Sequence, residues 1–245
     1  MKCILLCAGY ATRLFPLTEN FPKALLEIGN RPLLDYILDE VNTIDEVDNI
    51  YVITNDRYYK HFDKWATEKD NIKKIKVISD NTTSNDDRLG AIGDIMYVIN
   101  KENINDDLLI IAGDNLFTYK LKDVINFYNQ KQNTVVCAKE LDDIELLKRF
   151  AVAQIDNTDK VIDIEEKPNE PKSNLGVYAT YIYPREVLNY FETYKNEGNN
   201  MDSPGHFPQY LYKREDIYVY KFNGECYDVG THETLKEVNK IYSRR

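Results

Sequence analysis

The first half of this 245-residue chain alternates short apolar runs with longer amphipathic runs, and this pattern limits the fold more than any other feature. Residues 2–8 (KCILLCA) and 108–112 (LLIIA) are almost continuously apolar, as expected of strands buried on both faces of a sheet. Between them, residues 32–43 place apolar side chains at helical spacing. Such alternation predicts right-handed crossovers and an α/β fold with a mainly parallel central sheet between layers of helices.

The same patterns predict the remaining elements. Further strands are expected over residues 49–54, 75–79 and 134–138, and further helices over residues 58–69, 91–100 and 121–130. The second half is richer in strands, expected over residues 150–155, 160–165, 176–183 and 217–222, with a closing helix over 231–242. Residues 190–212 contain several glycines and prolines and are predicted to form a loop-rich segment that covers the substrate. No linker divides the chain, so we expect a single domain over residues 1–245.

Charge excludes some classes of function. With 31 Lys+Arg against 41 Asp+Glu, the net charge is −10. General nucleic-acid binding needs a basic face, and attraction to an anionic membrane needs basic clusters, so we expect neither partner. Nor does any apolar run approach the ~20 residues of a membrane span. If this acidic chain acts on phosphates, it needs a few well-placed cations and a divalent metal.

The cysteines and the N-terminus indicate the compartment. Cys3, Cys7, Cys137 and Cys226 form no C-x-x-C pair, and three of them lie in apolar runs, which is typical of buried free thiols in a reducing environment. The first apolar run is too short for a secretion signal and is soon followed by Arg13. We therefore expect a cytoplasmic protein.

Two polar loops follow predicted buried strands, at the sheet edge where ligands of α/β folds bind. The loop over residues 9–23 contains small residues, which allow close backbone approach to a phosphate, and the cations Arg13 and Lys23. It matches neither the dinucleotide-binding G-x-G-x-x-G pattern nor the P-loop. Taken by itself, a loop of this composition is more often an ordinary solvated loop than a phosphate-binding loop.

Two carboxylates are candidate metal ligands. Asp114 directly follows the apolar run LLIIAG, and Asp228 precedes the last predicted helix. Magnesium is often held by one or two carboxylates together with substrate phosphates. The alternative is that both are turn or helix-start carboxylates.

Lys167, between Glu166 and Pro168 after a predicted strand, is a third candidate cation. It could bind an anionic substrate or belong to a surface ion-pair cluster. His61, His206 and His232 share no metal-ligand spacing and are interpreted as structural or surface residues. The chain has no nucleophile elbow, so covalent catalysis is not predicted.

Taken together, four ordered segments resemble the sugar-1-phosphate nucleotidyltransferases, and most closely the glucose-1-phosphate thymidylyltransferase type. The segments are LLCAGYATRLFPLTENFPKALLEIGNRPLLDYIL from residue 5, AGDNLF from residue 112, EEKP from residue 165 with PKSN behind it, and YDVGTHETL from residue 227. The resemblance extends over almost the whole chain. It implies a Rossmann-like three-layer α/β sandwich, with a nucleotide-binding half over residues 1–140 and a strand-rich, sugar-phosphate-binding half over residues 141–245.

The resemblance also implies an activity and the residues responsible for it. An NTP and a sugar 1-phosphate would give an NDP-sugar and pyrophosphate, with Mg²⁺ as cofactor, for polysaccharide or glycoconjugate synthesis. Arg13 and Lys23 would bind the triphosphate, Lys167 the sugar phosphate, and Asp114 and Asp228 the metal. The implied nucleotide-binding residues are Leu6, Ala8, Gly9, Asn85 and Gly90, and the implied sugar-binding residues are Glu166, Gly176 and Val177.

Three departures from the family pattern matter. Ala11 replaces the second glycine of the first loop, so we expect a slightly more crowded approach of the backbone to the nucleotide. Asn85 is shorter than the glutamine usual in the base-contacting segment, so the sequence does not assign the base. The residues after the last helix contain no left-handed β-helix, so we expect no additional acetyltransferase activity.

Two alternatives remain open. One is a cytidylyltransferase acting on phosphocholine, for which Tyr178, Tyr181 and Tyr227 could form an aromatic cage. The other is a catalytically silent nucleotide-sugar sensor. The sequence leaves the oligomeric state open, with a homo-oligomer as one option.

Overall fold

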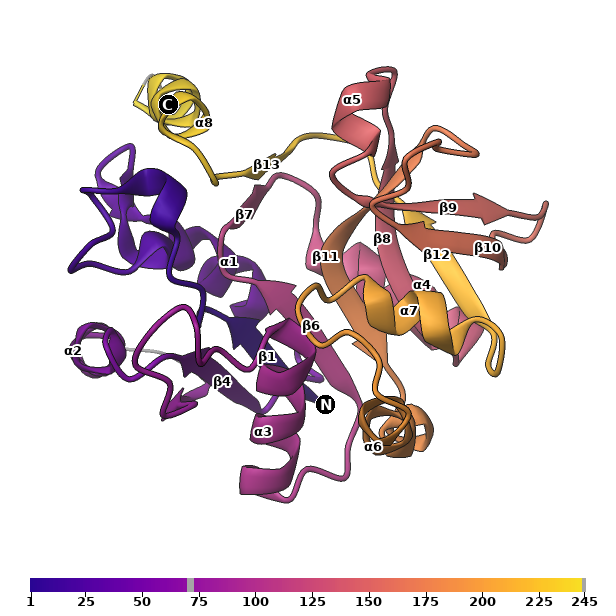
Figure 1. Ribbon diagram of the computed structural model, residues 1–245, viewed down its shortest axis with the longest axis horizontal. Helices are drawn as coiled ribbons and strands as arrows, with labels where there is room; N and C mark the ends of the chain where they lie inside the picture. Colours follow the sequence, from indigo (N-terminus) through magenta and orange to yellow (C-terminus); the bar gives the residue numbers. More distant parts are fainter. Residues whose placement is uncertain (70–72, 244–245) are drawn as a thin grey trace. The chain divides into compact units, whose positions relative to one another are not determined.

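The computed structural model describes residues 1–69 and 73–243 and divides into two compact units (Figure 1). The first unit contains Met1–Leu89, Ile111–Leu121 and Gly224–Arg245. The second contains Gly90–Ile110 and Lys122–Asn223. These boundaries differ from the linear division at residue 140, because the chain leaves the first unit and returns to it twice. As an assignment of nucleotide-binding and sugar-binding halves, that division stays a prediction.

The first unit is built on a parallel ladder of β1 (Lys2–Leu6), β4 (Asn49–Thr54) and β5 (Lys74–Ser79). Helices α1 (Leu33–Asn42) and α2 (Tyr59–Thr67) follow the first two of these strands in the order that the sequence predicts. Their apolar faces are buried; Leu33, Ile37 and Phe62, for example, have at most 1 % of their surface exposed.

Short elements complete the first unit. Two 3-10 turns, η1 (Thr12–Leu14) and η2 (Lys23–Leu25), lie in the loop after β1, and β2 (Glu27–Ile28) pairs with β3 (Arg31–Pro32). Strand β7 (Asn115–Phe117) pairs antiparallel with β13 (Cys226–Asp228), which leads into α8 (His232–Tyr242). The sequence predicted α8 but not the β7–β13 ladder, because three-residue strands have no measurable periodicity.

The second unit contains five strands in the order β10-β9-β11-β8-β12. They are β8 (Thr134–Glu140), β9 (Ala151–Ile155), β10 (Val161–Glu166), β11 (Leu175–Tyr183) and β12 (Ile217–Lys221). All neighbours run antiparallel except β8 and β12. Its helical elements are α3 (Ala91–Glu102), α4 (Leu121–Lys131), α5 (Ile144–Leu147), η3 (Arg185–Val187), α6 (Asn189–Asn196) and α7 (His206–Leu211). Strand β6 (Leu108–Ala112) leads the chain from the second unit into the first.

The predicted fold class is confirmed: the chain is α/β with a mainly parallel central sheet, and its second half is strand-rich. Among the described residues, we find no helix that is both long and apolar enough to cross a membrane. Cys3, Cys7 and Cys137 are buried, as predicted, while Cys226 is half-buried.

The prediction of a loop-rich segment over residues 190–212 is partly wrong. Helices α6 and α7 occupy its two ends, and only residues 197–205 between them are non-helical. The rings of Phe191 and Phe207 stack with centroids 3.7 Å apart, and Tyr194 packs edge-on against Phe207. Burial of these aromatic side chains stabilises two short helices despite the flanking glycines, and Pro208 lies in the first turn of α7, where proline is tolerated.

Candidate active site

Asp114 is positioned by a close contact between the end of β1 and the turn after β6. The Gly113 N–H donates to the Leu6 carbonyl at 2.9 Å, which aligns the two segments. A Cβ atom on Gly113 would lie only 2.3 Å from the Cys7 Sγ, so a side chain here would displace the thiol. The Cys7 thiol therefore packs against Gly113, and this contact positions Asp114, the next residue in the chain.

We expect Gly113→Ala to destabilise the protein by about 1–3 kcal/mol, the usual cost of overpacking a filled interior. Urea denaturation would measure the loss. The double variant Gly113→Ala/Cys7→Ala should recover part of it, because it removes the thiol from the path of the new methyl group. Gly9→Ala is the control for stability, since a Cβ on Gly9 meets nothing within 4 Å. Equal costs for Gly113→Ala and Gly9→Ala would contradict the contact.

The two predicted metal ligands lie on adjoining backbone segments. Asp228 is paired with Asn115 in the β13–β7 ladder, and the Val229 N–H donates to the Asp114 carbonyl at 3.1 Å. The Lys23 ammonium, at the start of η2, forms an ion pair with the Asp114 carboxylate. The pair is partly shielded from water, since the two side chains are 15 % and 30 % exposed.

Arg13 lies on the side of Asp228. A Cβ atom on Gly230 would lie 3.2 Å from a guanidinium nitrogen of Arg13 and 3.1 Å from Asp228 Oδ1, so both charged groups approach this glycine. The first unit thus brings together two cations and two carboxylates that the sequence placed in three separate segments: Arg13, Lys23, Asp114 and Asp228.

The loop that positions Arg13 has a left-handed residue at its start. Ala11 has a φ of +47°, a conformation that glycine adopts most readily, and its carbonyl accepts a hydrogen bond of 2.8 Å from the Thr18 hydroxyl. A glycine would adopt this backbone conformation with less strain. The more crowded approach of the backbone to a nucleotide stays a prediction.

His232 is a residue whose role the sequence did not predict. It is the first residue of α8, whose N-terminus is capped by a capping box between Thr231 and Thr234. The His232 Nε2 lies 2.9 Å from the Phe15 carbonyl and so ties the Arg13 loop to the start of α8. Only the tertiary contact reveals this, because the histidine has no motif partner in the sequence.

The predicted nucleotide-binding residues lie in different settings. Leu6 is at the end of β1, the buried Ala8 accepts a hydrogen bond of 2.8 Å from the Asn55 amide, and Gly9 is exposed. Asn85 lies in an exposed loop in which Asp87 accepts hydrogen bonds from the backbone of Thr83 and Ser84. These hydrogen bonds lower the pKa of the Asp87 carboxyl.

Gly90 belongs to the second unit and immediately precedes α3. Its φ is +77°, and a Cβ atom there would lie 2.4 Å from the Met201 carbonyl oxygen. This position requires glycine for packing, whatever its role toward a base.

The predicted sugar-phosphate residues meet in the second unit. The Lys167 ammonium lies 2.7 Å from the Ser203 Oγ and 3.4 Å from Glu166 Oε1. The Glu166 side chain is 6 % exposed, whereas that of Lys167 is 53 % exposed. Lys167 also has a φ of +49°; strained conformations of this kind cluster at functional sites.

Gly176 and Val177 lie on β11 beside this pair. Ala151 of β9 is opposite Glu166 on one side and Val177 on the other, which places Glu166 and Val177 in one row across the sheet. A Cβ atom on Gly176 would lie 2.7 Å from the Leu141 Cδ1, so this glycine makes room for a leucine. Contact of Gly176 or Val177 with a sugar stays a prediction.

The aromatic cage considered from the sequence is not formed by Tyr178 and Tyr181. Both are core residues with at most 4 % of their surface exposed. The Tyr178 ring packs against Phe150 and Phe222, and burial raises the pKa of Tyr181 well above its usual range. These two rings are therefore unavailable to a quaternary ammonium.

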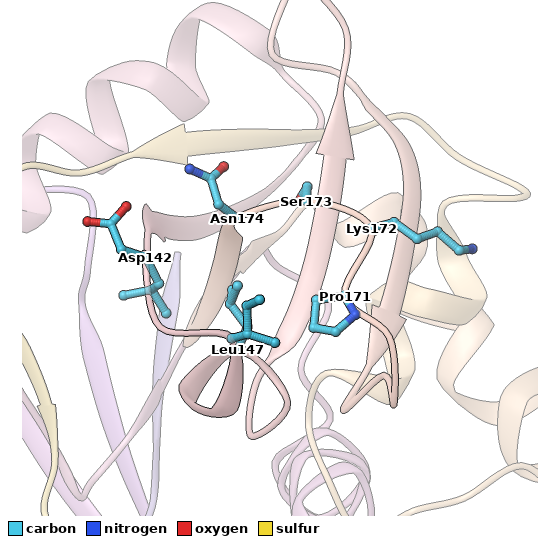
Figure 2. Close-up of a pocket in the computed structure, with 8 residues that line it drawn as sticks. Asp142, Leu147, Pro171, Lys172, Ser173 and Asn174 are labelled. Atoms are coloured by element: carbon cyan, nitrogen blue, oxygen red, sulfur yellow. The ribbon is translucent and has the colours of Figure 1, made fainter.

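A separate pocket of about 360 Å³ lies on the second unit near α5 (Figure 2). It is lined by Leu141, Asp142, Ile144, Leu147, Pro171, Lys172, Ser173 and Asn174. Figure 2 shows the Lys172 side chain pointing away from Asp142, and its ammonium pairs with Asp163 at 2.8 Å. None of the candidate catalytic or binding residues lines this pocket.

The donor atoms in the first unit fit a magnesium ion that is coordinated by both protein and substrate oxygens. Within residues 1–69 and 73–243 we find no cluster of three or more His, Cys, Asp or Glu side chains that could hold a metal by itself. Asp114 and Asp228 lie on adjoining backbone segments, and carboxylates are the oxygen ligands that Mg²⁺ prefers when substrate phosphates complete its coordination, so their chemistry fits the ion.

Comparisons with known proteins identify the family of the chain. The family model for nucleotidyl transferases matches residues 2–245. The bifunctional protein GlmU of Methanococcus aeolicus is 31 % identical over 240 residues, which are 98 % of this chain and 54 % of that protein. A protein of Sulfolobus acidocaldarius, provisionally named a mannose-1-phosphate guanyltransferase, is 29 % identical over 98 % of this chain and 62 % of its own length.

The chain thus spans a little over half the length of these curated relatives. Among solved structures, a Bacillus anthracis protein provisionally assigned as a glucose-1-phosphate thymidylyltransferase, in complex with sucrose, has a TM-score of 0.85 at 27 % identity, covering 100 % of this chain and 96 % of that one. The match of the family model over almost every residue is decisive: the chain belongs to the nucleotidyl transferase family.

Proposed function

We propose that this chain transfers a nucleotidyl group from an NTP to a sugar 1-phosphate, giving an NDP-sugar and pyrophosphate for polysaccharide or glycoconjugate synthesis. The single observation that best supports the proposal is the cluster of Arg13, Lys23, Asp114 and Asp228, which joins two cations to two carboxylates. The named relatives differ in the nucleotide or sugar in their names, so the proposal does not specify either.

The reaction requires little covalent chemistry from the protein. A phosphate oxygen of the sugar 1-phosphate attacks the α-phosphorus, the bond from the α-phosphorus to the bridging oxygen breaks, and pyrophosphate leaves with the electron pair. The attacking oxygen is already anionic, so no general base is needed. The protein must orient the two substrates and stabilise negative charge.

The residues of the first unit have the chemistry for the triphosphate. Arg13 offers a forked donor to phosphate oxygens, and Lys23 can exchange its ion pair with Asp114 for a phosphate oxygen. In this proposal Asp114 and Asp228 hold Mg²⁺, which when bound neutralises charge on the phosphates. The backbone of Leu6, Ala8 and Gly9 would contact the nucleoside, with Asn85 and Gly90 near the base.

The residues of the second unit have the chemistry for the sugar phosphate. Lys167 presents a half-exposed ammonium to an incoming phosphate, and the carboxylate of Glu166 can accept hydrogen bonds from sugar hydroxyls. Gly176 and Val177 would line the sugar site.

The test is a pyrophosphate-release screen of the purified protein with Mg²⁺. Each of ATP, CTP, GTP, UTP and dTTP is combined with a panel of sugar 1-phosphates and with phosphocholine. We expect release with at least one sugar 1-phosphate. Release of pyrophosphate only with phosphocholine would mean that phosphocholine, and not a sugar 1-phosphate, is the acceptor substrate. Binding of nucleotide without release in every combination would favour a nucleotide-sugar sensor.

A further inference from the structure

Residues 201–205 (Met-Asp-Ser-Pro-Gly), here called the 201–205 segment, form the second part of the connection from α6 to α7. They contact the candidate sugar-phosphate residues. Ser203 is 9 % exposed, and its Oγ lies 2.7 Å from the Lys167 ammonium. This hydroxyl is closer to the ammonium than the Glu166 carboxylate, which lies 3.4 Å away. Nothing in the sequence motifs assigns a role to Ser203.

The 201–205 segment is anchored at the start of α3. The N–H groups of Ala91 and Ile92 donate to the carbonyls of Asp202 and Met201 at 2.9 and 3.0 Å. First-turn N–H groups of a helix have no partner within the helix, so these carbonyls supply one. On its other side, the Ser203 carbonyl accepts a hydrogen bond of 3.2 Å from the His206 N–H at the start of α7. The backbone that carries the Ser203 side chain is therefore held by hydrogen bonds to both α3 and α7.

The same segment also packs against Glu166. A Cβ atom on Gly205 would lie 2.0 Å from Glu166 Oε2, so only a glycine allows the backbone this close to the carboxylate. The Glu166 N–H donates to the Gln209 side chain of α7 at 2.6 Å. The Glu166 carboxylate is thus buried against the 201–205 segment. Lys167 next to it is half exposed and needs a partner to hold its long side chain in one orientation.

We propose that Ser203 is a positioning residue, which holds the Lys167 ammonium in the orientation that binds the phosphate of the sugar 1-phosphate. This inference rests on the proposed function and extends it to a residue outside the recognised motifs. Ser203 acts through Lys167 and needs no contact with the substrate.

The first test compares Ser203→Ala with wild type, using the nucleotide and sugar phosphate pair that the wild type converts fastest. We expect kcat/KM for the sugar 1-phosphate to fall about tenfold, at the lower limit of the range for loss of a hydrogen bond to a charged group, because Lys167 is half exposed. The KM for the NTP should not change, because Ser203 acts only on the group that binds the sugar phosphate. A general loss of structure would instead change the KM for both substrates. Ser203→Thr keeps the hydroxyl and should restore most of the loss.

Two controls separate positioning from packing. Ser173→Ala removes another hydrogen-bonded serine of the second unit, whose hydroxyl donates to the Ala153 carbonyl at 2.5 Å, and should leave kcat/KM unchanged. In a Lys167→Ala background, Ser203→Ala should cause no further loss, because the residue acts only through Lys167. An equal tenfold loss in that background would show a direct role for Ser203 and overturn the proposal.

A measurement without substrates separates this inference from the proposed function. Brief labelling with acetic anhydride, followed by mass spectrometry, measures the reactivity of Lys167 against the exposed Lys213 as internal reference. We expect Ser203→Ala to increase labelling of Lys167 several-fold and to leave Lys213 unchanged. If the wild type releases pyrophosphate with no combination of NTP and acceptor, the proposed function fails. The labelling experiment then tests by itself whether Ser203 orients the Lys167 ammonium. Unchanged labelling of Lys167, or unchanged kcat/KM in an active enzyme, would refute the positioning role.

Discussion

Asp114→Ala is expected to lower the rate of pyrophosphate release by at least about 10²–10³-fold, the usual effect of removing one preorganised charged group from such a site. The carboxylate has two tasks in the proposed reaction, since it pairs with Lys23 and is a ligand for Mg²⁺. Its loss leaves Asp228 as the neighbouring carboxylate and deprives Lys23 of its ion-pair partner.

Steady-state kinetics at several Mg²⁺ concentrations would measure both consequences. The variant should need more Mg²⁺ for half-maximal rate, and its circular dichroism spectrum should match that of the wild type. Asp45→Ala is the matched control, because it removes an exposed carboxylate of the same unit from the helix–strand loop and should leave the rate unchanged. A correctly folded Asp114→Ala protein with near-normal turnover would rule out the assignment.

Lys167→Ala is expected to have an effect of similar size, at least about 10²–10³-fold on turnover. Lys167→Ala should differ from Asp114→Ala in the substrate whose binding it weakens. The KM for the sugar 1-phosphate should rise, while binding of the NTP alone, measured by calorimetry, should be unchanged. Lys213→Ala removes an exposed cation of the same unit and should be silent.

Lys167→Arg should recover little of this activity. The ammonium is held as a point charge by Ser203 Oγ and Glu166, and the planar, branched guanidinium cannot reproduce that geometry. Full activity of Lys167→Arg would instead indicate that any cation at this position suffices, and would contradict a precisely positioned ammonium.

Much of the fold could be predicted because its signals are local. The apolar runs LLIIA and NIYVIT and the helical spacing in residues 32–43 depend only on neighbouring residues, and the structure places β6, β4 and α1 there. The helices α6 and α7 were missed because their stability depends on the contact between Phe191 and Phe207, which lie 16 positions apart in the sequence (207 − 191). Similarly, β7 and β13 exist only as partners of each other.

The candidate site shows the same division. The charged residues Arg13, Lys23, Asp114, Lys167 and Asp228 could be named from the sequence, because each stands in a recognisable motif. The tertiary contacts around them could not be named. The Ser203 hydroxyl meets Lys167, the His232 ring meets the Phe15 carbonyl, and the Cys7 thiol packs against Gly113 only once the chain folds. Tyr178 and Tyr181 show the opposite case. As aromatic residues they suggested a cage for a quaternary ammonium, but both are buried in the core and cannot contact a ligand.

The sequence alone therefore determined the α/β class, the acidic surface charge and the few cations and carboxylates suited to phosphate chemistry. Tertiary structure decided which of these groups meet: Lys23 with Asp114, Arg13 with Asp228 around Gly230, and Lys167 with Ser203. The physical reason is that charge and hydrogen-bonding capacity are properties of single side chains and can be read from the sequence. Hydrogen bonds and ion pairs require distances of about 3 Å between two side chains. The residues that form them can be far apart in the sequence, as Lys23 and Asp114 are at 91 positions.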